Sequence, residues 1–421
     1  MAPEGWNPDM EELNNRRVER YRKRQEENRK KRKKKLMVLI ASVGLAVIGM
    51  TALFFLLRAD QKPEPEQPRV TTSSEETPKG ATVIHLVAAG DVNVTDAVVA
   101  SGGAEYDYTD TFLDVAHLLA DGDITVLNFE GNLCGAPYGN TTSSAPQSMA
   151  QALHRAGVDL VQLANSYSIN QGISGLQATI QSVKEAGMEP LGVYADERAY
   201  KAGKGYTIRD VQGVRIAFVA FTKGMDGMTL PQGSEHCVNV LYEDYDSTYQ
   251  ELNRKRITEI LDDVAAEKPD LTVAMLHWGS EYNDTISDSQ EAVVSLLQAK
   301  GVDAIIGTHP HYVHQMTYDP ETGFFVAYSL GDFISDGTRA GTEYSVVLNL
   351  EITKAGGDAK ITGYSYTPIF TVAEKGKPLR CVRIAETMAA FESNYIKRIN
   401  ESTYSAMEYA LTRIEARVAG E

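Results

Sequence analysis

Residues 36–57, LMVLIASVGLAVIGMTALFFLL, form a continuous apolar run of 22 residues without a charged side chain. As a helix the run would be about 33 Å long, enough to cross a bilayer core of about 30 Å. Two other readings are a cleaved signal peptide and a buried core helix. The apolar region of a signal peptide is shorter, and the basic leader here is unusually long for one. The run therefore predicts one transmembrane signal-anchor helix.

The charges on either side of this run predict its orientation. The sequence RKKRKKK (Arg29–Lys35) lies directly before it, whereas only Arg58 and Lys62 lie close beyond it. Positive charge concentrates on the cytoplasmic side of membrane helices. We therefore expect a single-pass cell-membrane protein with residues 1–35 as a basic cytoplasmic tail and the main domain outside the cell. The basic tail could bind RNA, but it fits better as a topology signal that also contacts anionic lipid.

The overall charge hides an asymmetry between the tail and the rest of the chain. Residues 1–35 hold 13 of the 41 Lys and Arg and seven of the 57 Asp and Glu, which leaves 28 basic and 50 acidic residues elsewhere, a net charge of −22. Binding to nucleic acid needs a cationic surface that faces the phosphates. The main body is therefore not expected to bind nucleic acid.

The composition changes twice after the apolar run. Residues 58–80 are rich in Pro, Glu, Ser and Thr, cannot bury apolar surface, and predict an extended stalk. From residue 81 to 375, short apolar runs alternate with helical patterns, which is typical of an α/β domain. Residues 376–421 have apolar residues at roughly helical spacing and predict a C-terminal helical segment, either a cap or an amphipathic tail packed on the domain.

Within the main domain the sequence predicts eight strands and four helices. The predicted strands are Val83–Ala89, Ile124–Phe129, Leu160–Ala164, Arg215–Phe221, Leu271–Leu276, Ala304–Ile306, Phe324–Tyr328 and Tyr344–Leu350. The predicted helices are Thr111–Ala120, Gly175–Ala186, Ser247–Ala266 and Asp288–Lys300. The later apolar segments have no helices between them and are expected to pair antiparallel. This mixture predicts two packed sheets with helices outside.

Polar residues follow five of the apolar runs, at the strand ends where open α/β sheets bind their ligands. These residues are Asp91, Asn128 and Glu130, Asn165, His277 and Glu281, and His309, His311 and His314. Carboxylates can bridge two cations, imidazoles fill terminal positions, and an amide oxygen is a neutral ligand. Their order along the chain therefore suits a two-metal site. Taken alone, a Gly-Asp pair is often only a turn, and His277 could be a core histidine.

The segments AAGDV, NFEGNL, LHWGSEY, IIGTHPHYVHQ and YSLGDFI, in this order, resemble the CapA family of poly-γ-glutamate capsule synthesis proteins. The resemblance covers about residues 81–370. That family is similar to the calcineurin-like metallophosphatases and is bacterial, with an N-terminal membrane anchor. The resemblance implies a four-layer α/β/β/α sandwich, metallophosphatase-like, preceded by a single N-terminal transmembrane helix. It also implies a site at the strand ends.

The resemblance assigns a role to each matching residue. Asp91 and His311 would bind the first metal ion, and Glu130 stands where the superfamily has its bridging Asp. Asn165, His277 and His309 would bind the second ion. The ions would be divalent, such as Mn, Mg, Fe or Zn, and either one or two ions are expected. Asn93, Asn128, Glu281, His314 and Asp332 are further residues expected to line the site.

The sequence departs from the family pattern in three places. Asn93 stands where the wider superfamily often has a His, and Asp332 stands where YSLGNF would have an Asn. The third departure is the stretch ANSYSINQG (Ala164–Gly172), which usually reads NNHxxDxG in the family. There Tyr167 replaces the His that serves the hydrolases as an acid, and Asn170 replaces the Asp that orients it.

The changed loop bears directly on catalysis. Losing such an acid typically lowers a rate by about 10²–10⁴-fold, and the unperturbed pKa of a tyrosine, about 10, makes Tyr167 a poor acid–base group near neutrality. The His and its Asp partner changed together, which indicates that the acid relay is absent. Tyr167, His277 and His309 are the candidate catalytic residues if catalysis persists. Asp332 would supply a replacement carboxylate if the fold brings it near.

Three functions follow from these observations. The first is a membrane-anchored extracellular protein of capsule biosynthesis or export that handles an anionic polymer such as poly-γ-glutamate. The second is an active metal-dependent hydrolase of phosphoesters or amides. The third is a pseudoenzyme scaffold that recruits a membrane-bound polymer synthase. The sequence alone leaves open whether the protein is an enzyme.

Overall fold

The computed structural model of the 421-residue chain describes residues 69–71, 80–393 and 398–421. The chain divides into two compact units, Met1–Pro65 and Glu66–Glu421, and every described residue belongs to the second. The expected basic tail, the transmembrane helix of residues 36–57 and most of the expected stalk lie outside the described residues. Among the residues that are described, no helix combines the length and the apolar character needed to span a bilayer.

The larger of two β-sheets holds the first part of the site. Its nine strands are β1 (Arg69–Thr71), β2 (Thr82–Asn93), β3 (Ile124–Glu130), β4 (Leu160–Gln162), β5 (Glu189–Leu191), β12 (Asp332–Ile334), β13 (Tyr344–Ala355), β14 (Asp358–Val372) and β15 (Arg380–Arg383). The main path runs β1-β14-β13-β2-β3-β4-β5, while β12 pairs with β2 and β15 with β14. Strands β2 to β5 are mutually parallel, and β13–β14 is a long antiparallel hairpin.

The smaller sheet holds the second part of the site. Its six strands are β6 (Tyr206–Val211), β7 (Val214–Thr222), β8 (Leu271–His277), β9 (Ala304–Thr308), β10 (Met316–Tyr318) and β11 (Phe325–Ala327), in the order β10-β11-β9-β8-β7-β6. The four central strands are parallel, and the edge strands β6 and β10 are antiparallel to their neighbours. Strands β8 and β9 are buried along their whole length, which explains why they read as continuous apolar runs rather than alternating ones.

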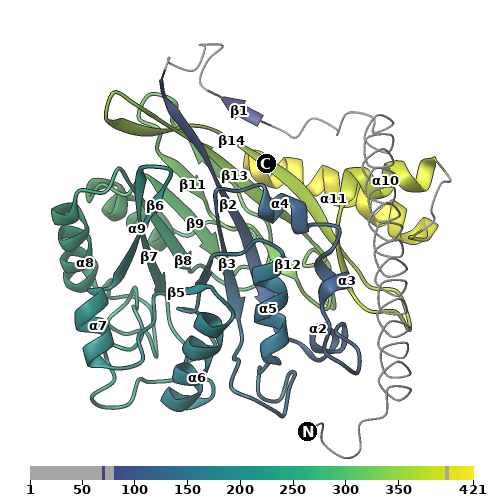
Figure 1. Ribbon diagram of the computed structural model, residues 1–421, viewed down its shortest axis with the longest axis horizontal. Coiled ribbons are helices and arrows are strands. Elements are labelled where there is room, and N and C mark those ends of the chain that lie inside the picture. Colours follow the sequence, from purple (N-terminus) through teal and green to yellow (C-terminus); the bar gives the residue numbers. More distant parts are fainter. Residues whose placement is uncertain (1–68, 72–79, 394–397) are drawn as a thin grey trace, which may run out of the picture. The chain divides into compact units, whose positions relative to one another are not determined.

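The described helices cover the sheets on three surfaces (Figure 1). They are α2 (Asp96–Ala100), α3 (Thr109–Phe112), α4 (Ala116–Ala120), α5 (Gln147–Arg155), α6 (Gly172–Glu185), α7 (Glu197–Gly203), α8 (Arg254–Glu267), α9 (Asp288–Ala299), α10 (Ile384–Glu392) and α11 (Glu401–Ala419). Helices α2 to α6 share one apolar cluster with the outer face of the larger sheet. Helices α8 and α9 share another with the outer face of the smaller sheet.

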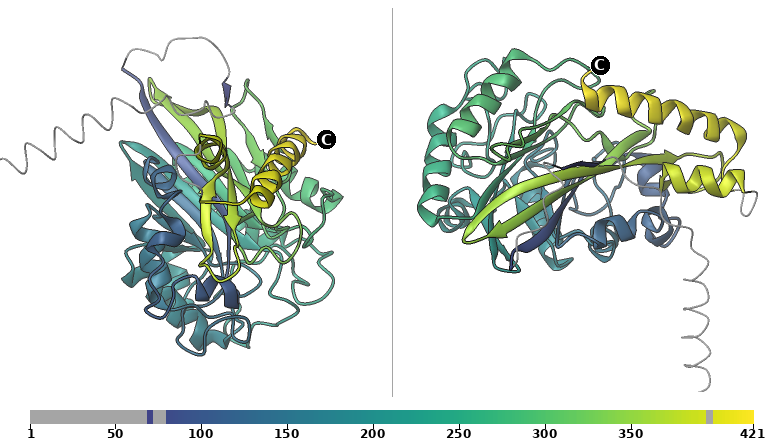
Figure 2. Two further views of the ribbon diagram at one scale, coloured as in Figure 1. Left: turned by 90° about the vertical axis from the view of Figure 1, so that its right-hand side faces the viewer. Right: turned by 90° about the horizontal axis from the view of Figure 1, so that it is seen from above.

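A third apolar cluster joins the inner faces of the two sheets. It includes Leu86 of β2, Phe218 of β7 and Val273 of β8, so the sheets pack face to face between the two outer helical layers. The hairpin β13–β14 contacts α10 and α11, whose apolar residues Met407 and Ile414 belong to the same inner cluster. Figure 2 shows these two helices lying beside the hairpin. The C-terminal helices therefore bury the part of the inner face that the hairpin contributes.

All eight predicted strands are confirmed, but two predicted helices are wrong in extent. The segment Thr111–Ala120 is broken into α3 and α4 rather than forming one helix. The predicted helix Ser247–Ala266 begins only at Arg254, because the Asn253 side chain caps it by accepting from the backbone N–H of Arg256 at 3.2 Å. The sequence analysis missed the short helices α2, α5 and α7.

Candidate metal centre

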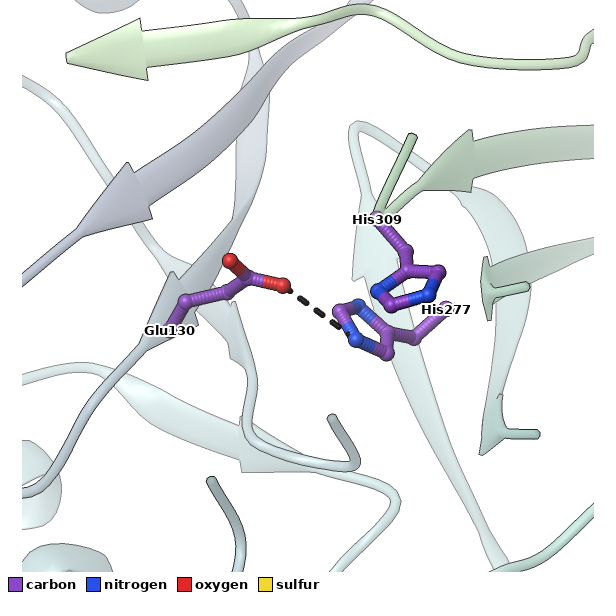
Figure 3. A group of neighbouring side chains, drawn as sticks. All are labelled: Glu130, His277 and His309. Carbon is purple, nitrogen blue, oxygen red and sulfur yellow. Dashed lines mark ion pairs between the residues drawn. The ribbon is translucent and has the colours of Figure 1, made fainter. Parts of the chain in front are cut away.

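The carboxyl ends of strands from both sheets converge on one buried group of polar side chains. Asp91 lies near the end of β2 and Glu130 is the last residue of β3, whereas His277 ends β8. His309 and His311 follow β9 directly. All five are buried, and Figure 3 shows the Glu130 carboxylate pointing toward the imidazoles of His277 and His309. Face-to-face packing of the sheets thus brings together residues that lie far apart in the chain. Asp91 and His309, which share a hydrogen bond, are 218 positions apart.

A close contact between β2 and β12 places Asp91. A Cβ atom on Gly90 would lie 1.7 Å from the carbonyl oxygen of Gly331, so only glycine fits at this position. The backbone N–H of Asp91 donates to that same carbonyl at 3.0 Å. The Asp91 carboxylate accepts from Asn128 Nδ2 at 2.7 Å and from the His309 backbone N–H at 3.0 Å. A residue of strand β3 in the larger sheet and the loop after β9 in the smaller sheet therefore hold this carboxylate in place.

The centre contains two overlapping sets of potential metal ligands. In the first, which we name the carboxylate-rich group, ligand atoms of Asp91, Glu130 and His311 all lie within 4.8 Å of one another. In the second, the histidine-rich group, ligand atoms of Glu130, His277 and His309 meet the same limit. Glu130 belongs to both groups, with Oε1 3.2 Å from His277 Nε2 and Oε2 3.8 Å from His311 Nε2. Glu130 is therefore positioned to bridge two cations.

Unpaired polar atoms test whether these residues fit metal ions. Among the described residues, both carboxylate oxygens of Glu130 and both ring nitrogens of His309 are buried without a hydrogen-bond partner. Leaving one buried polar group unpaired costs about 1–3 kcal/mol, and more for a charged one. Divalent cations would satisfy these atoms, and mixed carboxylate and imidazole ligands suit Mn, Fe or Zn ions. The residues therefore fit a two-metal centre.

Burial shifts the pKa values of the ligand side chains, upward for the carboxyl groups and downward for two of the histidines. It raises the pKa of Asp91 to about 7 and raises the pKa of Glu130 well above its usual range, with the Asp91 charge adding to the effect on Glu130. Burial also lowers the pKa of His277 and His309 well below the ordinary value. Metal ligands must be ionised carboxylates and neutral imidazoles. Cations would thus keep the carboxylates ionised, while the two histidines are already neutral.

Asp332 lies beside the centre and contacts a histidine ligand directly. Its Oδ1 atom is 2.7 Å from His311 Nδ1, which leaves His311 Nε2 facing Glu130. Burial opposes the charge on His311, but the Asp332 and Glu130 carboxylates outweigh it and raise the His311 pKa well above its usual value. Carboxylates commonly orient metal-binding histidines in this way. The departure at Asp332 therefore supplies a positioning carboxylate for His311.

The predicted amide ligand, Asn165, lies at the edge of the centre. Its Nδ2 atom donates to Asn128 Oδ1 at 3.1 Å and to the Phe129 carbonyl at 2.7 Å. Its Oδ1 atom accepts from the backbone N–H of Tyr167 at 3.0 Å. Every polar atom of the amide is thus bound by protein. The Asn165 side chain therefore links its own loop to the end of β3. Asn128 in turn donates to the Asp91 carboxylate.

The structure adds Ser166, a residue that the sequence analysis missed. Its hydroxyl lies 3.1 Å from His277 Nε2, the ring atom that also faces Glu130. On the other side of the ring, Thr308 Oγ1 lies 3.3 Å from His277 Nδ1. The family pattern NNHxxDxG has its second Asn at this position, so a signal was present in the sequence, but only the path of the loop shows that Ser166 reaches a strand of the other sheet.

Tyr167 is partly buried and stays protonated. Burial raises its pKa, and the negative charges of Glu130, Asp226 and Glu281 add to the rise. The phenol can therefore donate a hydrogen bond but cannot serve as a base near neutral pH. Asn170 donates through Nδ2 to Ser143 Oγ at 3.2 Å. The backbone N–H of Asn170 donates to the Tyr167 carbonyl at 3.1 Å, but no hydrogen bond between their side chains is found among the described residues, so the two do not form an acid relay.

The other predicted site-lining residues take three different places. Asn93, the last residue of β2, is in register with Glu130. Glu281 is exposed, yet its charge contributes to the raised pKa of Glu130, so it lies at the rim. His314 is turned to a different partner, because its Nε2 atom lies 2.8 Å from the Asn283 carbonyl. His314 belongs to neither ligand group.

The His-Pro-His segment has an unusual backbone. His309 has φ of 94° and His311 has φ of 62°, both in the left-handed region that side chains rarely adopt. Such conformations cost about 1–3 kcal/mol each and cluster at functional sites. The carbonyl of Pro310, between them, accepts from the backbone N–H of Tyr282 at 3.0 Å. The strain is thus held by contacts that aim both imidazoles at the centre.

Comparison with known sequences decides the family. The family described as bacterial capsule synthesis protein PGA_cap matches residues 85–337, which include all members of both ligand groups. The chain belongs to this family. The resemblance predicted from the motifs is therefore confirmed.

Two curated relatives of this PGA_cap chain are CapA proteins. The capsule biosynthesis protein CapA of Bacillus anthracis is 28% identical over 217 residues, which are 52% of this chain and 50% of that protein. The PGA biosynthesis protein CapA of Bacillus subtilis (strain 168) is 27% identical over 216 residues, covering 49% of each chain. The chain thus spans about half the length of the curated relatives it matches.

Solved structures that resemble this PGA_cap chain share little sequence with it. The calcineurin-like phosphoesterase YfkN from Bacillus subtilis has a TM-score of 0.43 at 16% identity, over 79% of this chain and 99% of that one. The 5'-nucleotidase from Candida albicans SC5314 has a TM-score of 0.40 at 11% identity, over 83% of this chain and 59% of that one.

Proposed function

We propose that this chain is a membrane-anchored, cell-surface protein of capsule biosynthesis that binds an anionic polymer, such as poly-γ-glutamate, at a two-metal centre. Membership in the PGA_cap family supports the link to capsule synthesis. The observation that carries the metal-dependent part is Glu130, a buried carboxylate shared by both ligand groups and left without a hydrogen bond among the described residues. A carboxylate so placed is costly unless cations neutralise it.

Each residue of the centre has a proposed role in binding the ions or the polymer. Asp91 and His311 would hold one ion, His277 and His309 the other, and Glu130 would bridge them. When bound, the ions would act as Lewis acids that attract carboxylate oxygens and polarise an amide or phosphoryl group. Asp332 orients His311, and Ser166 steadies His277. Tyr167, kept neutral, would donate a hydrogen bond to an oxygen of the bound polymer.

The location is part of the same proposal. The uncharged run of residues 36–57 is long enough to span a bilayer, and the basic residues before it favour a cytoplasmic N-terminus. A centre outside the cell would meet a capsular polymer as it leaves the membrane. A membrane-bound synthase is the expected partner of such an anchored protein, and nucleic acid is not. Protease accessibility of the main domain on intact cells tests the orientation.

A second candidate function is an active hydrolase of phosphoesters or amides. The observation that favours it is the complete pair of ligand groups around Glu130. The loop of Tyr167 and Asn170 argues for slow turnover, because its side chains form no acid relay. We therefore expect weak or no hydrolysis of model phosphodiesters.

Metal analysis joined to an activity screen tests both functions. The full chain, purified in detergent, should bind two Mn²⁺ ions and show a higher thermal midpoint when Mn²⁺ is added. A protein that stays metal-free and shows no thermal shift would rule out the metal-dependent function. Brisk hydrolysis of phosphodiesters or γ-glutamyl amides that disappears in His277→Ala would instead establish the hydrolase.

A further inference from the structure

Lys223, next to the histidine-rich group, carries a positive charge that no ligand group uses. It follows β7, where its backbone N–H donates to the His277 carbonyl at 2.8 Å. Its side chain is partly buried, and Nζ donates to the Gly279 carbonyl at 2.9 Å. Burial lowers the pKa of His277 and His309, and the Lys223 charge adds to both shifts. The two hydrogen bonds to His277 and Gly279 therefore hold the ammonium beside the chain segment that carries His277.

Arg339 occupies the other side of the centre, next to the carboxylate-rich group. Its guanidinium carbon is 3.8 Å from the ring centroid of Tyr282. That tyrosine in turn stacks on His311, with the ring centroids 5.0 Å apart and the planes 22° apart. Arg339 is exposed, and its guanidinium makes no ion pair with another described residue. A stacked guanidinium is held flat, with its hydrogen-bond donors free at the edge.

We propose that Lys223 and Arg339 bind the anionic groups that flank the group held at the metal centre. The site would thus select a chain bearing several carboxylates over a molecule bearing one. This inference rests on the proposed function and names the feature of the polymer that the site recognises. A γ-linked polyglutamate carries one carboxylate on every residue. When one carboxylate binds the metal ions, the carboxylates of the two adjacent residues lie on either side of it. A molecule with a single carboxylate could bind the metal ions but would contact neither Lys223 nor Arg339.

Lys223 and Arg339 should contribute different amounts to the affinity for the polymer. Lys223 is partly buried and already donates to one carbonyl, so its contact with a carboxylate is partly shielded from water. Charge-assisted hydrogen bonds of this kind correspond to about tenfold or more in affinity. Arg339 is exposed, and exposed ion pairs correspond to about threefold. Added salt should weaken the Arg339 contact more than the Lys223 contact.

Calorimetry with Mn²⁺-loaded full chain tests the inference. The probes are acetate and a γ-linked glutamate pentamer. The wild-type chain should bind the pentamer about 30-fold more tightly than acetate, from the product of the two contacts. Lys223→Met should lower pentamer affinity about tenfold and Arg339→Met about threefold, with acetate affinity unchanged. Lys223→Arg should keep most of the pentamer affinity.

Matched variants and measurements keep folding apart from recognition. Lys255→Met and Arg198→Met remove exposed cations of α8 and α7 and should leave pentamer binding unchanged. Mn²⁺ content and the thermal midpoint of each variant report whether the centre is intact. Variants that bind the pentamer as the wild type does, or that lose acetate and pentamer equally, would overturn the inference.

Two further probes separate this inference from the proposed function. These are an α-linked glutamate pentamer and a phosphodiester oligomer. If either binds in place of the γ-linked chain and depends on Lys223 and Arg339, the polymer in the proposed function is wrong while the flanking contacts stand. If the wild-type chain prefers no polyanion over acetate, the flanking contacts do not exist, whatever metal it holds.

Discussion

The loop of residues 307–314 and the loop of residues 164–172 both reach the metal centre. The first carries His309 and His311, which adopt strained left-handed backbone conformations and belong to the two ligand groups. The second carries no member of either group, yet Ser166 contacts His277 and Tyr167 stays a neutral donor. The histidines that would hold the ions and the residues that replace the family's acid relay thus lie on different loops, so one loop can change while the other persists.

The largest effect should come from removing the carboxylate that both ions would share. Glu130→Gln should lower Mn²⁺ affinity by more than about 100-fold, since even outer partners of metal ligands account for about 10–100-fold. Both ions should be lost together, as measured by elemental analysis of the purified protein. Glu281→Gln, at the exposed rim, is the matched control and should keep both ions. Retention of one full equivalent in Glu130→Gln would show that the groups do not share a ligand.

Restoring the acid relay tests the other loop. The double variant Tyr167→His with Asn170→Asp should raise phosphodiester turnover about 100-fold, the usual contribution of a positioned acid. Tyr167→His alone should gain less, because Asn170 is bonded to Ser143 and cannot orient the new ring. Metal content should stay the same in both. Unchanged turnover in the double variant would mean that the loop is not what slows the site.

Asp332, the first residue of β12, contacts His311 in the loop of residues 307–314. Asp332→Asn should lower Mn²⁺ affinity about tenfold to 100-fold, because an amide holds the His311 ring less firmly than a carboxylate. Titration of the metal-free protein with Mn²⁺ measures this change. The exposed Asp358→Asn serves as the comparison and should titrate like the wild type. Equal affinity in Asp332→Asn would show that the contact with His311 is merely structural.

The pH dependence of metal binding should be a smaller but systematic effect. The Asp91 pKa is raised to about 7 and the Glu130 pKa is raised well above its usual range, so protons compete with the ions below about pH 7. Mn²⁺ affinity should fall about tenfold for each pH unit below 7 for every proton displaced.

The same shifts affect the stability of the metal-free protein. The folded chain keeps protons on Asp91 and Glu130 that the unfolded chain releases above about pH 4, so these groups reduce stability as the pH rises from about 4 toward 7. The thermal shift caused by Mn²⁺ should therefore grow between pH 6 and pH 8. A thermal shift that does not change with pH would contradict the raised carboxyl pKa values.

The sequence alone predicted the strands well because buried parallel strands read as unbroken apolar runs. It also predicted the polar residues of the site, because ligands of α/β sheets bind at the carboxyl ends of the strands, where these residues lie. It failed where local patterns compete. Thr111–Ala120 has helical spacing but is broken into α3 and α4, and Ser247–Ala266 lost its first residues to the cap at Asn253.

The sequence by itself determined the family, the order of the metal-binding motifs and the changed residues Tyr167, Asn170 and Asp332. Tertiary structure decided how these residues are used: Glu130 shared by both groups, Asp332 against His311, and Ser166 against His277. It also placed Lys223 against the backbone of His277 and Gly279, and Arg339 on the ring of Tyr282, which stacks on His311. The physical reason is that the contacts of Glu130, Asp332 and Ser166 join residues of two separate sheets. Their relative position depends on how the inner faces pack, which no local pattern in the chain records.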